Sequence, residues 1–225
     1  MKKILLVLTA IVALTATSCT SNEKKAYKLI KQHMYESLYD YKSYEPTKTT
    51  VEVWYPYIFF NEDALEYAQK GIEYTKKVEL LKEELEDTER DMEFAKSLLG
   101  NYESSYSRHQ YNRAKKEYDE YSTELIDFSK KSIQTMLDIY EIQENIEKSQ
   151  DDVLGWIGIH KFRCNTRGGY AAVGEYIFLM NADFSEIINV YDAADDEFVE
   201  CTAYIKVILE EHTKEELVEL YQNFE

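Results

Sequence analysis

Residues that interrupt helices are scarce in this chain of 225 residues. It contains only two prolines and seven glycines, so long helices can run without a break. Basic side chains are also few, 26 against 43 acidic ones, and the net charge is −17. A surface of that sign repels phosphate backbones, so we expect no nucleic-acid partner.

Cysteine is rare as well, with Cys19, Cys164 and Cys201 as its three instances. Cys164 and Cys201 could form a disulfide in an oxidising compartment, and the sequence leaves both states open. The acidic residues between 192 and 197 lack the spacing and the glycine of a calcium loop. No nucleophile motif or phosphate-binding glycine loop is present either. We therefore expect no catalytic residue, no metal and no cofactor.

The one long apolar run lies at the N-terminus. Lys2 and Lys3 precede residues 4–14, which are apolar apart from Thr9. This run is shorter than the roughly 20 residues of a membrane-spanning helix, and small residues follow it. The pattern predicts a cleaved signal peptide over residues 1–18. The segment Ala16-Thr17-Ser18-Cys19 that follows resembles the lipobox of bacterial lipoproteins, in which the cysteine thiol is acylated.

That resemblance implies that Cys19 is the lipidated first residue of the mature chain. Residues 19–23 would then be a short tether, and the membrane would be a partner through the acyl chains. We expect a location in the cell envelope, anchored in the outer membrane. The mixed charges of residues 20–26 leave open which membrane face the chain occupies.

The middle of the chain has the pattern of two long amphipathic helices. Apolar residues recur at steps of three and four from 65 to 99 and again from 111 to 146. Gly100 and Asn101 form a helix-stop signal between the two runs. We predict helices over 62–99 and 104–148, joined as an antiparallel hairpin with a seam like that of a coiled coil.

Shorter elements flank the hairpin. We predict a helix over 24–41, a helical tail from about 196 with a capping box at Thr213, and strands over 49–55, 156–164, 173–180 and 187–191. The first strand cannot bury its apolar face alone, so it must pair with the later ones. The predicted fold class is α+β: residues 24–60 plus 152–225 form a discontinuous domain with an antiparallel sheet, one packing helix and a C-terminal helix. Residues 61–151 form the inserted hairpin.

The order of short motifs in the flanking segments resembles an uncharacterised family of small Bacteroidota-type lipoproteins. The motifs are Ser43-Tyr44-Glu45-Pro46, His160-Lys161-Phe162-Arg163, Gly168-Gly169-Tyr170 and Tyr176-Ile177-Phe178. The resemblance covers residues 24–60 and 152–192. It implies one helix packed across a short antiparallel sheet, and it implies no enzymatic activity.

Tyrosines around the hairpin tip are candidates for partner binding, because a tyrosine combines a large ring with a hydroxyl that tolerates water. We expect Tyr111, Tyr118 and Tyr121 to fill the helical seam. The candidates for contact with a partner are Tyr102, Tyr106, Arg108 and His109.

Three residues of the predicted strand 156–164 are weak candidates for a pocket: His160, Arg163 and Cys164. His160 and Cys164 share one face of the strand but lie about 13 Å apart along it. That distance is too long for two ligands of one metal ion. We therefore expect a half-buried histidine and a buried thiol rather than a reactive pair.

These observations favour a non-enzymatic envelope lipoprotein whose hairpin binds an unknown envelope protein or a second copy of the chain. The main alternative is a hydrolase or a small-ligand binding protein with a pocket between the sheet and the first helix. A chaperone that grips clients with helical arms is a third candidate.

Overall fold

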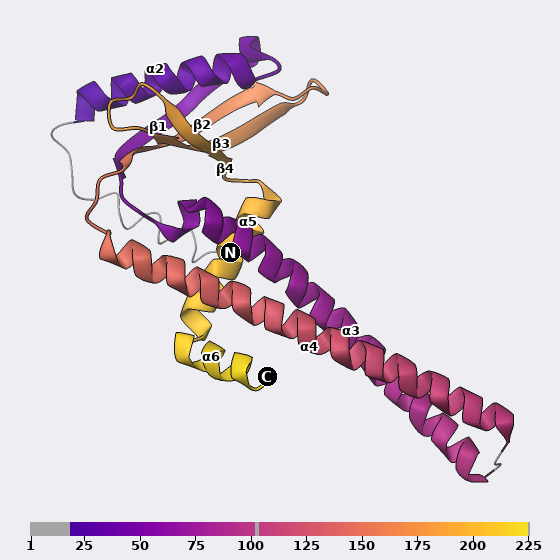
Figure 1. The fold of residues 1–225 in the computed structure, drawn as a ribbon. Helices are drawn as coiled ribbons and strands as arrows, with labels where there is room; N and C mark the ends of the chain where they lie inside the picture. Colours follow the sequence, from indigo (N-terminus) through magenta and orange to yellow (C-terminus); the bar gives the residue numbers. More distant parts are fainter. Residues whose placement is uncertain (1–18, 102–103, 225) are drawn as a thin grey trace. The chain divides into compact units, whose positions relative to one another are not determined.

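The computed structural model describes residues 19–101 and 104–224 (Figure 1). The predicted signal peptide and Tyr102 lie outside these residues. The chain forms two compact units: described residues up to Pro56 with Ser149–Val199, and Tyr57–Lys148 with residues 200–224. None of the described helices is long and apolar enough to cross a membrane.

The fold class is α+β, as predicted. Four strands form one antiparallel sheet in the order β1-β2-β3-β4. They are β1 (Glu45–Trp54), β2 (Gly155–Asn165), β3 (Ala171–Met180) and β4 (Ile187–Asp192). The helical elements are α2 (Cys19–Ser37), η2 (Tyr41–Ser43), η3 (Ile58–Phe60), α3 (Glu62–Asn101), α4 (Ser105–Lys148), α5 (Asp196–Glu211) and α6 (Lys214–Gln222).

The first strand is longer than the sequence pattern predicted. β1 begins at Glu45 rather than at residue 49, and its register with β2 shifts between Pro46 and Lys48. Proline lacks the N–H that an inner strand would donate, but an edge strand or a bulge accommodates it. β1 is an edge strand, so pairing continues past the proline to Arg163.

Helix α2 covers one face of the sheet in the first unit (Figure 1). Its fully buried residues, Ala26, Ile30 and Met34, recur every fourth position and therefore form one stripe. They join a cluster that contains Val51, Phe162, Phe178 and Met180. At Gly158 an added Cβ would lie 3.0 Å from Ile30 Cδ1, so the absent side chain allows the helix to approach the sheet.

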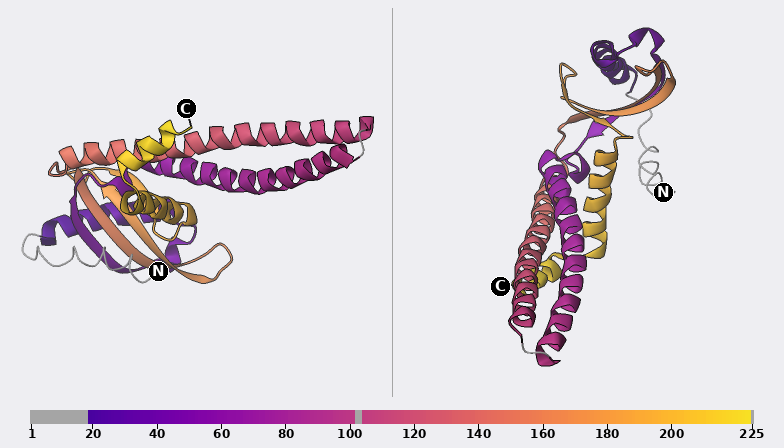
Figure 2. Two further views of the ribbon diagram at one scale, coloured as in Figure 1. Left: turned by 90° about the horizontal axis from the view of Figure 1, so that it is seen from below. Right: turned by 90° about the vertical axis from the view of Figure 1, so that its right-hand side faces the viewer.

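The second unit is built on α3 and α4, which lie side by side and antiparallel (Figure 2). At 1.5 Å per residue, these helices of 40 and 44 residues are about 60 and 66 Å long. Their buried and half-buried residues alternate steps of three and four, the coiled-coil spacing. On α3 these seam residues are Val78, Leu81, Leu85, Thr88, Met92, Ala95 and Leu99; on α4 they are Ser107, Tyr111, Ala114, Tyr118, Tyr121, Leu125 and Phe128.

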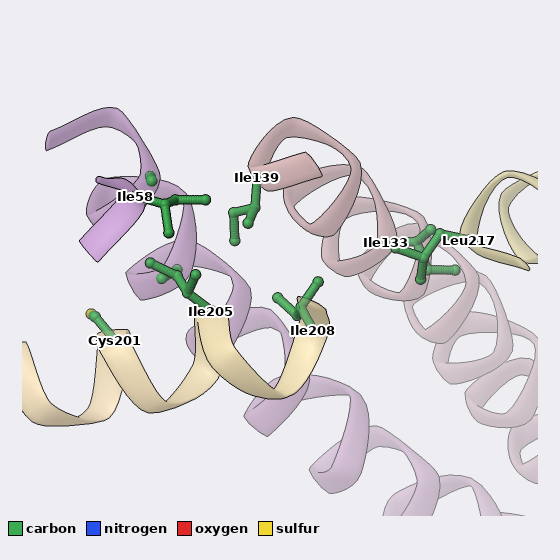
Figure 3. Close-up of a cluster of buried hydrophobic side chains, with 9 residues drawn as sticks. Ile58, Ile133, Ile139, Cys201, Ile205, Ile208 and Leu217 are labelled. Atoms are coloured by element: carbon green, nitrogen blue, oxygen red, sulfur yellow. The ribbon is translucent and has the colours of Figure 1, made fainter. Parts of the chain in front are cut away.

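The C-terminal helices correct the predicted domain division. We assigned residues up to 225 to the sheet domain, but residues 200–224 belong to the unit of the hairpin. Their buried side chains, Cys201, Ile205, Ile208 and Leu217, pack with Ile58, Ala64, Ala68, Ile133 and Ile139 (Figure 3). Small residues on α3 leave room at the base of the hairpin, and the apolar stripe of α5 fills it. The hydroxyl of Tyr140 also donates to the carbonyls of Ile208 and His212 near the end of α5.

Candidate functional site

The outer part of the hairpin extends past α5 and α6 to the tip (Figure 1). We define the distal hairpin as residues 79–101 and 104–124. Its buried side chains are Leu81, Thr88, Ala95, Ser107 and Ala114, all of which are seam residues. Four of these five are small or polar, so Leu81 is the one large apolar side chain that the described part of the distal seam buries fully. The distal hairpin is therefore held together weakly compared with the base of the hairpin.

Ion pairs on the outer faces of the helices add little to this stability. Arg113 pairs with Glu117 at 2.9 Å, and Lys116 pairs with Glu120 at 3.3 Å, each one helical turn apart. Exposed pairs of this kind are worth about 0.3–0.5 kcal/mol each.

A reciprocal serine cap fixes the start of α4 at the tip. The Ser107 amide donates to Ser104 Oγ at 3.1 Å, and the Ser104 amide donates to Ser107 Oγ at 3.0 Å. A hydroxyl that accepts from an amide two or three positions along the helix satisfies a group that the helix leaves unpaired. The cap therefore orients the first turn of α4, which carries Tyr106.

Large apolar side chains are exposed on the distal hairpin. The exposed fractions are 57% for Leu80, 66% for Phe94 and 68% for Tyr106. When the seam residues are assigned to heptad positions a and d, Leu80, Phe94 and Tyr106 each fall at position c. In an antiparallel helix pair the c positions of both helices lie on the same side, next to g. We call these three residues the tip flank, in which Leu80 lies about 21 Å from Phe94 along α3, on the side away from the tip. Ile126, 45% exposed at position b, lies on the opposite side.

The predicted partner contacts fall partly on this surface. Tyr106, Arg108 and His109 are exposed in the first turns of α4. The sequence pattern did not single out Phe94 and Leu80, because each lies within a charged stretch typical of a solvated helix face. The signal that could have found them is the heptad register, which assigns both to the same outward position.

The predicted pocket residues lie in the sheet unit, and His160 is fully buried there. Tyr44 Oη lies 2.7 Å from its Nε2, and Thr49 Oγ1 lies 2.8 Å from its Nδ1. The imidazole stacks on Phe162 with ring centroids 5.7 Å apart. Burial lowers the pKa of His160 to about 4, so the ring is neutral at pH 7. Burial also raises the pKa of Tyr44, so its hydroxyl keeps its proton.

The other two pocket candidates are not brought to His160. Arg163 is exposed, and Cys164 is half-buried on the same strand four residues from the histidine. Burial, with a smaller effect of the Asp40 carboxylate, raises the pKa of the Cys164 thiol, which makes it a poorer nucleophile. The space beside His160 is occupied by buried side chains, among them Phe162 and Phe178.

The remaining titratable groups give no further site. Cys164 and Cys201 are both thiols and form no disulfide with each other. Across residues 19–101 and 104–224, no three His, Cys, Asp or Glu side chains gather closely enough to hold a metal ion.

Comparison with protein-family models, with curated proteins and with solved structures found no match to this chain. The resemblance to small Bacteroidota-type lipoproteins therefore remains a prediction from the short motifs. The tip flank and the buried His160 are the two candidate sites, and they differ in what they leave open to other molecules. The tip flank is exposed, whereas both nitrogens of His160 already have hydrogen-bond partners.

Proposed function

We propose that this protein is a lipoprotein of the cell envelope, anchored at Cys19, whose distal hairpin binds another protein. The observation that carries the proposal is the tip flank. Leu80, Phe94 and Tyr106 are large apolar residues that contribute nothing to the seam and stay exposed. The proposed role is non-enzymatic.

The energetics favour a partner at the tip flank. Burying a large apolar side chain contributes about 1.5–3 kcal/mol, and aromatic residues are enriched at the centres of interfaces. Charged residues surround these side chains on both helices, which supplies the polar rim of a typical interface. A partner that covers the flank would also stabilise the weak seam beneath it.

The anchor would tie the chain to the membrane close to folded structure. Helix α2 begins at Cys19, so an acyl group there would be attached at the first residue of the helix that covers the sheet. One or more acyl chains provide membrane affinity without a spanning helix.

The alternative of a hydrolase or a ligand-binding pocket has less support. Its best candidate, His160, is fully buried and bonded to two hydroxyl groups rather than to a carboxylate. A general base needs access to the proton that it removes, and an orienting carboxylate usually assists it.

Site-specific photocrosslinking in intact cells tests the proposed interaction. A photoreactive residue at position 94 or 106 should give the same crosslinked product, whereas one at Ile126 on the opposite flank should give little of it. Equal crosslinking at all three positions, or none at 94 and 106, would contradict the proposal. A crosslinked product with twice the apparent mass of the uncrosslinked mature protein would identify the partner as a second copy of the chain.

Metabolic labelling with palmitate tests the anchor separately. The label should enter the wild-type protein and be absent from the Cys19→Ala variant. Labelling that persists in this variant would place the lipid elsewhere, and a wild-type protein without label would refute the anchor.

A further inference from the structure

The outer face of α2 carries a row of lysines. Lys24, Lys28 and Lys31 recur at steps of four and three, so they lie on one side of the helix. All three are exposed, and Lys25 is exposed beside them. The row lies opposite the stripe that α2 buries against the sheet, which includes Ile30. Tyr35, 67% exposed, continues the row, and Tyr39, 73% exposed, follows in the turn after α2 ends at Ser37.

This row is unusual in so acidic a chain. Residues 19–39 contain four lysines and two glutamates, whereas the chain from residue 40 onward contains 20 basic and 41 acidic residues. No carboxylate of the described residues forms an ion pair with any of the four lysines. The basic stretch on α4 differs, because Arg113 and Lys116 pair with glutamates one turn away.

We infer that the lysine row of α2 lies against an anionic lipid surface. This inference rests on the proposed anchor at Cys19. Lys24 is five residues beyond the anchor and Lys31 is twelve, or about 8 Å and 18 Å along the helix. A lipid attached at Cys19 would thus hold the row within reach of the headgroups. The tyrosine rings suit the same boundary, where an apolar body meets lipid and a hydroxyl meets water.

The net negative charge of the chain does not prevent this contact. At physiological ionic strength the Debye length is about 8 Å, so charges farther from the surface are largely screened. The groups that count are those on the outer face of α2 and at its borders. The border carboxylates are Glu23, Glu36 and Asp183. Glu36 accepts a hydrogen bond from Gln32. Hydrogen bonds from Ser185, with a smaller effect of Lys25, lower the pKa of Asp183. Lysines therefore predominate on the part of α2 nearest the lipid.

The contact would set the orientation of the sheet unit. An acyl anchor alone lets a domain rotate about its tether. A helix that lies in the membrane plane through its lysines adds a second attachment, and two weak signals together hold a protein at a membrane much better than one. The sheet would then lie on the side of α2 that faces away from the lipid.

Vesicle flotation tests the inference without the acyl group. The chain from residue 19 onward, carrying Cys19→Ser, is mixed at 50 mM NaCl with vesicles of phosphatidylcholine containing 30% phosphatidylglycerol. It should float with these vesicles, should not float with pure phosphatidylcholine, and should be released at 500 mM NaCl. Each lysine at a membrane surface contributes roughly a fivefold gain in affinity. The variant Lys24→Gln, Lys28→Gln, Lys31→Gln should therefore bind about a hundredfold more weakly.

A matched variant separates the row from net charge. Lys82→Gln, Lys96→Gln, Lys115→Gln removes three exposed lysines from the hairpin and should leave vesicle binding within twofold of the parent. An equal loss in this control would overturn the inference, as would unchanged binding by the α2 variant. Binding to polyglutamate but not to the vesicles would also overturn it, in favour of an acidic protein partner. Because the test chain carries no lipid, its result is independent of the palmitate labelling that tests the anchor.

Discussion

Replacing Gly71 by alanine should destabilise the hairpin unit, although the same change in an exposed helix is stabilising. Gly71 lies in α3, where helix propensity favours alanine by about 1 kcal/mol. An added Cβ, however, would lie 2.5 Å from Tyr204 Oη, 2.7 Å from Tyr204 Cε1 and 2.8 Å from Thr135 Oγ1. Ordinary contacts are about 3.5–4.0 Å, so the neighbours would have to move by about 1 Å.

That movement is resisted by the packing of α5. Tyr204 lies beside Ile205, and Ile205 and Ile208 are fixed in the core cluster at the base of the hairpin. Overpacking of this kind costs about 1–3 kcal/mol. After the gain in helix propensity is subtracted, Gly71→Ala should lower the free energy of unfolding by up to about 2 kcal/mol.

Gly100 provides the matched control in the same helix. An added Cβ there would meet no heavy atom within 4 Å, so Gly100→Ala should be neutral or stabilise by up to about 1 kcal/mol. Urea unfolding followed by circular dichroism at 222 nm measures both variants. Adding Tyr204→Phe should rescue part of the Gly71→Ala loss, because the oxygen nearest the new Cβ is removed. A Gly71→Ala protein that is stabilised over the wild type as much as Gly100→Ala would refute the proposed packing.

Three further predictions concern residues elsewhere in the two units. His160 has a pKa of about 4 in the folded chain and about 6.5 when unfolded, so its contribution to stability falls as pH drops from 6.5 to 4. Between pH 7 and pH 4 the free energy of unfolding of the wild type should therefore fall by about 3 kcal/mol more than that of His160→Gln. Urea titrations at a series of pH values measure both, and parallel pH profiles would contradict the prediction. Leu81→Ala should lower the free energy of unfolding by about 2–5 kcal/mol, because Leu81 is fully buried in the seam. Leu80→Ala, at the neighbouring exposed position, should change it by less than about 0.5 kcal/mol. Thr213→Ala removes the capping box of α6 and should lower the free energy of unfolding by about 1 kcal/mol. Thermal unfolding measures the change, and a change near zero would mean that α6 does not depend on its cap.

The sequence predicted most of the secondary structure because the signals are local. The steps of three and four along α3 and α4, and the stop signal of Gly100 and Asn101 at the end of α3, depend on residues within one or two helical turns. It was also predictable that β1 pairs with a strand about 100 residues later, since an isolated strand cannot bury its apolar face, and the structure shows that this strand is β2. The capping box at Thr213 was read from four consecutive residues and is present in the structure.

The candidate sites were less predictable. The sequence indicated an exposed Tyr106 at the tip, but it did not distinguish Phe94 from a residue on a charged, solvated face. It placed His160 on a strand but could not supply its partners. Tyr44 and Thr49 are more than 110 residues away in the chain and reach the ring only because β1 pairs with β2.

The sequence by itself therefore determined the order of the elements, the approximate bounds of the two long helices and the direction of their apolar faces, because these follow from backbone geometry and local periodicity. Only the tertiary structure decided which apolar face meets which. Burial of apolar surface is non-directional, so the stripe of α5 could have covered any complementary face. The small residues of α3 and the isoleucines of α4 form the hollow that α5 fills, and this fit assigns the C-terminal helices to the hairpin rather than to the sheet.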